Sequence, residues 1–128
     1  MARILLIDDD RLVRQSIRLA LSESGHHVEE AENGADGLER ITVARPDLVI
    51  TDLIMPEREG IETILAVRRI APDLPIIAIS GGGRIGPGDL LAAAKRLGAT
   101  TTLRKPFDDV ELIQQIERVL QPAKAAVD

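Results

Sequence analysis

Three carboxylates and one ammonium group stand at the ends of short apolar runs and could form one charged site. Asp8 and Asp9 follow RILLI, Asp52 ends DLVITD and Lys105 follows TTLR. Two like charges about 4 Å apart repel by about 4 kcal/mol at an effective dielectric constant near 20. Converging carboxylates would therefore need a cation beyond Lys105, and Mg²⁺ prefers oxygen ligands. We interpret Asp8 and Asp9 as metal-binding residues and Asp10 as the N-cap of the next helix.

These side chains can converge only if the apolar runs are neighbouring strands. Runs of four to six aliphatic residues alternate with stretches of helical period, which is the pattern of βα units around a parallel sheet. The pattern predicts strands at about 3–7, 27–31, 47–51, 75–79 and 100–103. The first, third and fourth are almost entirely aliphatic, as is typical of central strands with helices on both faces.

Helices are predicted between the strands. Helical spacing of apolar residues, with Pro and Gly as stop signals, predicts helices at about 11–24, 34–44, 60–71 and 88–97, and a fifth that begins at the Asp108 cap and ends before Pro122. Asp108 and Glu111 have the spacing of a capping box in the fifth. The residues that mark these helices include Leu12, Leu65 and Arg68. Leu97 is expected to point inward, and Val110 is expected on the apolar face of the fifth helix.

Five βα units predict an α/β fold of the flavodoxin-like, doubly wound type. The expected architecture is a (βα)5 three-layer sandwich whose parallel sheet has the strand order 2-1-3-4-5. Ligands of such folds lie beyond the carboxyl ends of the first and third strands, where Asp8, Asp9 and Asp52 are expected. We assign residues 1–121 to one domain and 122–128 to a tail or the start of a linker.

Composition narrows the possible partners and compartments. The 128 residues include 16 basic and 21 acidic side chains, for a net charge of -5, which disfavours binding to nucleic acid or anionic lipid. There is no cysteine, and the apolar run before Asp8 is too short for a signal peptide or a membrane span. We therefore expect a cytoplasmic protein that binds neither nucleic acid nor membranes directly.

The motifs IDDD, TDLIMPEREG, AIS and LRKPF together resemble a response-regulator receiver domain of two-component signalling, over about residues 2–120. The resemblance implies that Asp52 accepts a phosphoryl group. It also implies that Asp8 and Asp9 hold Mg²⁺, with Asp9 as the direct ligand and Asp8 acting through water. Asp52 and the backbone carbonyl of Ile54 are implied as further metal ligands.

The same resemblance gives roles to Ser80 and Lys105. Phosphoryl transfer requires mainly positioning and neutralisation of charge, and a carboxylate is a suitable nucleophile. Lys105 would neutralise phosphoryl oxygens, while Ser80 would donate its hydroxyl to one and draw the loop that follows it inward. The Lys105–Pro106 peptide bond is expected to be cis, as in the family.

The implied function is that of a signalling switch, not of a metabolic enzyme. The phosphoryl donor would be a histidine kinase or a phosphotransfer protein. The changed surface would act on a downstream protein or a fused output domain, and phosphorylation-dependent homodimers are possible. The alternative is a receiver-like module that binds partners constitutively, because Thr102 replaces the usual aromatic switch residue and the loop at 81–88 is rich in glycine.

Other site types fit the sequence less well. A phosphohydrolase with an aspartate nucleophile would carry a second aspartate at position 54, which is isoleucine. A flavodoxin-like carrier would bring phosphate against the acidic residues 8–10. Gly81, Gly83 and Gly86 spell G-x-G-x-x-G, but that fingerprint belongs after the first strand. His26 and His27 belong to no metal-binding pattern.

Overall fold

The chain folds into five βα units in sequence order. A computed structural model describes residues 2–53, 59–81 and 87–121; the side chains of residues 59, 81 and 87–91 are not among the described features. The elements are β1 (Arg3–Ile7), α1 (Arg11–Glu23), β2 (His27–Ala31), α2 (Gly34–Val43), β3 (Leu48–Asp52), α3 (Glu59–Ile70), β4 (Ile76–Gly81), α4 (Pro87–Leu97), β5 (Thr101–Lys105) and α5 (Asp109–Leu120).

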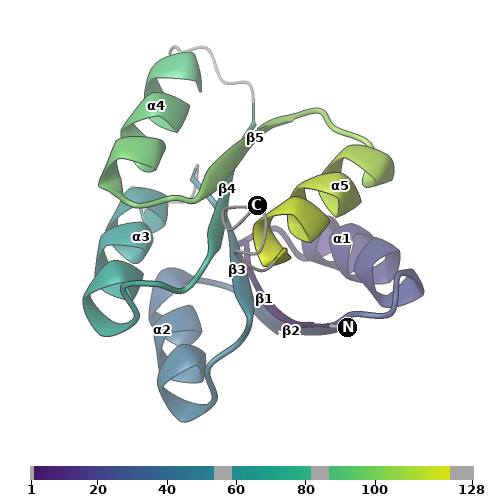
Figure 1. Cartoon of the computed structure of the whole chain (residues 1–128), viewed down its shortest axis with the longest axis horizontal. Coiled ribbons are helices and arrows are strands. Elements are labelled where there is room, and N and C mark those ends of the chain that lie inside the picture. Colours follow the sequence, from purple (N-terminus) through teal and green to yellow (C-terminus); the bar gives the residue numbers. More distant parts are fainter. Residues whose placement is uncertain (1, 54–58, 82–86, 122–128) are drawn as a thin grey trace, which may run out of the picture.

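The strands form one parallel sheet in the order β2-β1-β3-β4-β5. Helices α2, α3 and α4 cover one face, and α1 and α5 cover the other (Figure 1). The flavodoxin-like fold and its strand order are therefore confirmed. Because β1 and β3 are neighbours, their carboxyl ends lie side by side at the same edge of the sheet.

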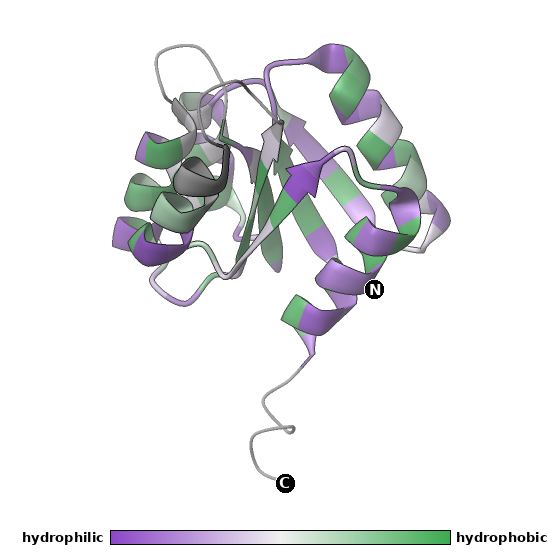
Figure 2. Cartoon of the chain, turned by 90° about the horizontal axis from the view of Figure 1, so that it is seen from above, coloured by the Kyte–Doolittle hydropathy of each residue, from purple (hydrophilic) through white to green (hydrophobic). Residues whose placement is uncertain are grey.

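The core has two layers, one on each face of the sheet. Leu5 and Val49 belong to the layer beneath α2, α3 and α4, whereas Leu6 and Ile50 belong to the layer beneath α1 and α5. Figure 2 shows the apolar strands enclosed between the two sets of helices. Successive side chains of β1 and β3 point into opposite core layers, so both strands are buried on both faces. Their carboxyl ends are therefore rigid supports for polar groups.

Three strands extend one or two residues beyond their predicted carboxyl ends. Asp52 pairs with Ile79 inside the sheet, and Gly81 of β4 pairs with Lys105 of β5. The predictions stopped earlier because Asp, Ser, Gly, Arg and Lys are not typical strand residues, whereas pairing with a neighbouring strand decides where a strand ends. As a result, Asp52, Ser80 and Lys105 all lie within strands.

Four of the apolar residues that mark the predicted helices are exposed, so the inward orientation predicted for Leu97 was wrong. Leu12 and Val110 are 75% and 62% exposed, and Leu65 and Leu97 are 38% and 39% exposed. Leu12 and Val110 lie in the first turns of α1 and α5, where Val13 and Leu112 are the residues that pack against the core. Burial on α3 instead belongs to Ile64 and Val67.

Caps define both ends of several helices as the sequence predicts. The Asp10 carboxylate accepts hydrogen bonds from the amides of Leu12 and Val13, which confirms its N-cap role. The capping box of Asp108 and Glu111 is also present. The Lys105–Pro106 bond is cis, as expected.

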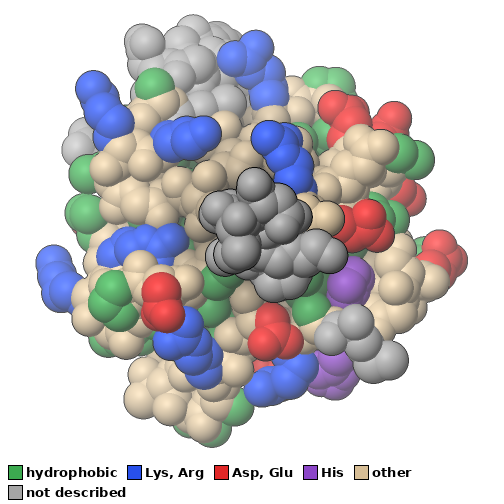
Figure 3. All heavy atoms as spheres, in the orientation of Figure 1, with side chains coloured by type: hydrophobic (Ala, Val, Ile, Leu, Met, Phe, Trp, Pro, Cys, Tyr) green, Lys and Arg blue, Asp and Glu red, His purple; other side chains and the backbone are tan. Residues whose placement is uncertain are grey.

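Charges are distributed unevenly over the surface. On the face drawn in Figure 3, most Lys and Arg side chains lie over α3 and α4, whereas Asp and Glu gather mainly on the side of α5. The last turns of α3 and α4 carry Arg68, Arg69, Lys95 and Arg96, which suits the negative ends of the helix dipoles. Within the described ranges, the structure contains no helix with the length and hydropathy needed to cross a bilayer.

Two predicted features lie outside the described residues. Positions 82–86 make up most of the glycine-rich loop, between β4 and α4. Positions 122–128 are the predicted tail, so the boundary at residue 121 stays a prediction.

Candidate functional site

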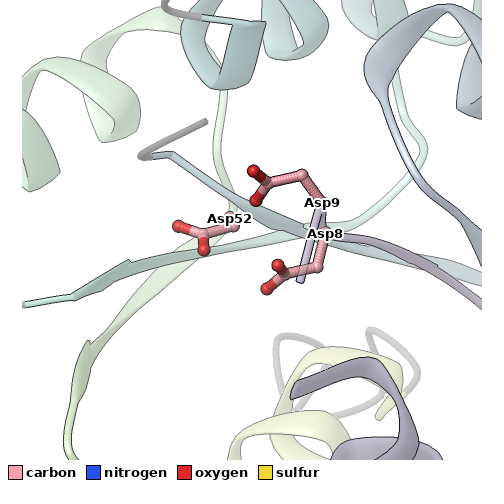
Figure 4. A group of neighbouring side chains, drawn as sticks. All are labelled: Asp8, Asp9 and Asp52. Atoms are coloured by element: carbon pink, nitrogen blue, oxygen red, sulfur yellow. The ribbon is translucent and has the colours of Figure 1, made fainter. Parts of the chain in front are cut away.

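The carboxylates of Asp8, Asp9 and Asp52 converge at the carboxyl ends of β1 and β3. Their oxygen atoms lie within 4.8 Å of one another. Figure 4 shows Asp8 and Asp9 extending from the end of β1, with Asp52 beside them at the end of β3. Asp8 and Asp52 are buried, whereas Asp9 is exposed. The geometry is that of an acidic cluster that opens to solvent on the Asp9 side.

The main chain around Asp8 is held by three hydrogen bonds. The Asp8 amide donates to the Ala31 carbonyl at 3.1 Å, which extends the path of β1 beside β2. The Asp8 carboxylate accepts a hydrogen bond from the Asp10 amide at 2.8 Å. The Asp8 carbonyl accepts one from the Arg14 guanidinium at 2.6 Å. The segment that carries the two acidic residues is therefore fixed by its neighbours.

Lys105 provides the positive charge of the site. Its ammonium group lies 3.3 Å from Oδ2 of Asp52, and the two side chains are 28% and 7% exposed. Because β4 separates their strands, this contact connects positions two strands apart in the sheet. The predicted approach of Lys105 to Asp52 is therefore present.

Burial, together with the neighbouring charges, raises the pKa of Asp8. Burial raises the pKa of Asp8 to about 6, and the charge of Asp52 acts in the same direction. The Asp10 amide and the charge of Lys105 act in the opposite direction but do not compensate. Three carboxylates thus converge with the single ammonium group of Lys105, an arrangement that favours binding of a divalent cation.

Ser80 lies on β4, between the strands of Asp52 and Lys105. Its side chain is fully buried, and its Oγ atom has no hydrogen-bond partner within the described parts of the chain. Buried hydroxyls are normally paired, so an unpaired one at the edge of a charged site is a donor available to a ligand.

Gly60, the second residue of α3, lies against the carboxyl end of β3. A Cβ atom at this position would lie 2.4 Å from Cα of Leu53 and 2.6 Å from the carbonyl oxygen of Asp52. Only glycine allows the start of α3 to approach the end of β3 so closely. The Ile54 carbonyl, predicted as a metal ligand, lies outside the described residues.

Sequence reasoning did not identify Arg14 and Glu30. Arg14 of α1 binds the Asp8 carbonyl and also forms an ion pair with Glu30 of β2, at 3.0 Å. Arg14 and Arg18 lie four residues apart on one face of α1, and Glu30 is one of two acidic residues near the end of β2. The i, i+4 spacing of the two arginines is the signal that could have suggested a link between α1 and an acidic residue of β2.

The two histidines lie away from the acidic cluster. His27 begins β2, and the His26 ring accepts a hydrogen bond from the amide of Ala2 at 3.2 Å. Both residues are thus near the amino ends of the strands, at the sheet edge opposite to Asp8 and Asp52. They do not belong to the candidate site.

Comparison with known proteins gives one family. Residues 4–117 match the sequence model of the family described as "Response regulator receiver domain". Response regulator MprA of Mycobacterium ulcerans (strain Agy99) is 36% identical over 126 residues, which are 98% of this chain and 53% of the relative. The chain thus spans about half the length of the curated relatives it matches.

Solved structures have the same fold. NtrX from Brucella abortus superimposes with a TM-score of 0.88 at 31% identity, over 98% of this chain and 28% of NtrX. Chemotaxis protein CheY4 of Vibrio cholerae gives a TM-score of 0.83 at 33% identity, over 94% of this chain and 99% of CheY4. The family match covers nearly all of the fold and includes every strand that contributes to the acidic site. This chain belongs to the response-regulator receiver domains of two-component signalling.

Proposed function

We propose that the chain is a phosphorylation-dependent signalling switch in which Asp52 accepts a phosphoryl group with the help of Mg²⁺. The observation that carries the proposal is the convergence of Asp8, Asp9 and Asp52 within 4.8 Å, with Lys105 3.3 Å from Asp52. Family membership supports it, because the family match over residues 4–117 includes all four residues.

In this proposal an oxygen of the Asp52 carboxylate attacks the phosphorus atom of the donor. The new bond joins Asp52 to phosphorus, the bond from phosphorus to the donor atom breaks, and its electron pair stays with the donor. The product is an acyl phosphate. Lys105 neutralises part of the charge on the phosphoryl oxygens, and the rigid ends of β3 and β5 keep nucleophile and cation aligned.

The residues present fit Mg²⁺. Asp8, Asp9 and Asp52 offer hard oxygen ligands, and these three carboxylates outnumber the one ammonium group of Lys105. Asp9 would bind the ion directly, Asp8 through water, and the Ile54 carbonyl would complete the protein ligands. When bound, the ion would neutralise charge on the transferring group.

Ser80 would convert phosphorylation into a change of shape. Its unpaired hydroxyl would donate to a phosphoryl oxygen, and that hydrogen bond exists only when the group is present. The phosphorylated protein would therefore favour the arrangement in which Ser80 and Lys105 close on the phosphoryl group. Half-buried Thr102 replaces an aromatic switch residue, so the signal would pass mainly through the main chain after Ser80.

The partners follow from the family as part of the proposal. A histidine kinase or a phosphotransfer protein would supply the phosphoryl group in the cytoplasm. A downstream protein, a fused output domain or a second phosphorylated copy would bind the altered surface. Because the curated relatives are about twice as long as this chain, an output domain is a reasonable expectation for the whole protein.

The test is incubation of the protein with Mg²⁺ and acetyl phosphate, followed by intact mass measurement. The proposal predicts a phosphoryl adduct that EDTA prevents. A protein that stays unmodified under these conditions, with its fold verified by far-UV circular dichroism, would favour the alternative of a constitutive interaction module.

A further inference from the structure

Arg14 makes the only side-chain hydrogen bond to the main chain of Asp8 among the residues that the structure describes. Its Nη1 atom donates to the Asp8 carbonyl at 2.6 Å, and its side chain is only 14% exposed. The peptide bond that contains this carbonyl joins Asp8 to Asp9. A guanidinium on α1 therefore fixes the peptide plane between the two acidic residues of the site.

Arg14 is itself held in place from β2. Its Nε atom donates to Oε1 of Glu30 at 3.0 Å, while Arg18 donates to Oε2 of the same carboxylate at 2.8 Å. Burial opposes ionisation of Glu30, but the hydrogen bonds from Arg18 and Arg14 prevail and lower its pKa. Glu30 is therefore an anion near neutral pH and orients the Arg14 guanidinium toward Asp8.

The two contacts of Arg14 need the shape of a guanidinium. One edge, Nε, binds the Glu30 carboxylate, and a terminal nitrogen reaches the Asp8 carbonyl. A lysine carries a single ammonium group on a flexible stem and does not reproduce this planar, two-sided arrangement.

We propose that Arg14, oriented by Glu30, is a positioning residue that holds Asp8 and Asp9 in the geometry for binding Mg²⁺. This inference rests on the proposed function, because it concerns the same metal site. It adds two residues that touch neither the metal nor the phosphoryl group in that function. Mutation of residues that hydrogen-bond to metal ligands and orient them typically changes metal affinity by 10- to 100-fold.

Simple electrostatics makes the opposite prediction, which gives the inference a clear test. Arg14 carries a positive charge close to a site for a cation, so its removal should strengthen Mg²⁺ binding if charge alone mattered. If Arg14 acts by positioning, its removal should weaken binding in spite of the lost repulsion. The direction of the change in affinity therefore separates the two roles.

The experiment measures Mg²⁺ affinity by isothermal titration calorimetry for the wild-type protein and for Arg14→Gln. We expect affinity to fall by about tenfold in Arg14→Gln, at the low end of the range for such groups. Phosphorylation by acetyl phosphate should need a correspondingly higher Mg²⁺ concentration for half-maximal rate, with a nearly unchanged rate at saturation. A general loss of stability would not produce this separation of the two parameters.

Two arginines of the same helix are matched controls. Arg11→Gln removes an exposed charge from the start of α1. Arg18→Gln removes the second arginine bound to Glu30, and the Arg18 side chain is 56% exposed. Both should leave Mg²⁺ affinity equal to or slightly above that of the wild type. Glu30→Gln should weaken it, because Arg14 then loses the carboxylate that orients it.

Each result decides the question. Unchanged or tighter Mg²⁺ binding in Arg14→Gln would overturn the inference but not the proposed function. Absence of Mg²⁺ binding in the wild-type protein would overturn both. If circular dichroism shows that Arg14→Gln is unfolded, Arg14→Lys decides: a weakening of roughly threefold or more is expected, and wild-type affinity would contradict the positioning role.

Discussion

The ammonium group of Lys105 lies 3.3 Å from Oδ2 of Asp52, although one strand separates β5 from β3. The two residues are offset by two positions along the sheet, since Asp52 pairs with Ile79 and Lys105 pairs with Gly81, so the lysine side chain spans this offset to reach the carboxylate. Lys105 and a bound cation would therefore compete for the charge of one carboxylate. Several properties of the site depend on this competition.

Replacement of Lys105 by Met should strengthen Mg²⁺ binding. The substitution removes a positive charge beside Asp52 while it keeps an apolar side chain of similar length. Affinity should rise by about three- to tenfold, equivalent to about 1 kcal/mol. Titration calorimetry measures the change, and Lys95→Met on the exposed surface of α4 is the control that should not alter affinity. Weaker binding in Lys105→Met would contradict the proposed competition.

Replacement of Ser80 by Ala should not destabilise the unphosphorylated protein. Its buried Oγ has no partner, and an unsatisfied polar group costs free energy, so the variant should gain about 1 kcal/mol in unfolding free energy. Urea unfolding measures this effect. The neighbouring Thr51→Val change is a useful comparison, because Thr51 donates a hydrogen bond to the Asp52 carbonyl and its loss should destabilise the fold. A loss of stability in Ser80→Ala would show that the hydroxyl is already engaged.

Replacement of Gly60 by Ala should damage both the fold and the site. The added Cβ would overlap Leu53 and the Asp52 carbonyl, so α3 or the end of β3 must move. We expect a loss of about 2–3 kcal/mol in unfolding free energy, together with weaker Mg²⁺ binding. Gly25→Ala, at a positive φ of 92° with no atom within 4 Å of the new Cβ, should destabilise the protein without changing metal affinity. Equal metal affinities in the two variants would argue against a role for Gly60 at the site.

The ion pairs of Glu30 should make stability depend on pH in a defined direction. The pKa of Glu30 is lower in the folded protein than its ordinary value of 4.5, so the pairs stabilise the fold above pH 4.5. Their contribution should disappear as pH falls through the folded pKa. Glu30→Gln should therefore lose about 1–2 kcal/mol near pH 7 and progressively less below pH 4.5.

Chemical unfolding of both proteins between pH 3 and pH 7 measures this difference. The exposed pair of Arg45 and Asp73 provides a comparison, because Asp73→Asn should change stability little at any pH. A difference between the wild type and Glu30→Gln that stays constant across this range would contradict the assignment.

Much of the fold was predictable because the aliphatic runs are strong signals. β1 and β3 are aliphatic strands buried on both faces, and each apolar run leads directly to a carboxylate, Asp8 or Asp52. The order of the strands and the convergence of Asp8, Asp9 and Asp52 followed from that pattern. The strand ends were less predictable, because pairing across the sheet brings polar residues such as Ser80 and Lys105 into strands.

The residues that hold the site and its helices in place could not be predicted from the pattern of apolar residues. Arg14 and Glu30 are separated by 16 positions and meet only because α1 packs beside β2. Arg68 marked the predicted third helix, but the sequence did not indicate that its guanidinium binds the carbonyls of Gly98, Ala71 and Leu74. Charged side chains with such contacts look like ordinary surface residues in a sequence, since their partners are set by tertiary structure.

The central claim is that Asp52 is the phosphoryl acceptor. Its most direct test is the intact mass of the wild-type protein, Asp52→Asn and Asp109→Asn after incubation with Mg²⁺ and acetyl phosphate, since Asp109 is an exposed aspartate of α5. We predict one phosphoryl adduct in the wild type and in Asp109→Asn, and none in folded Asp52→Asn. An adduct that persists in Asp52→Asn would contradict the claim.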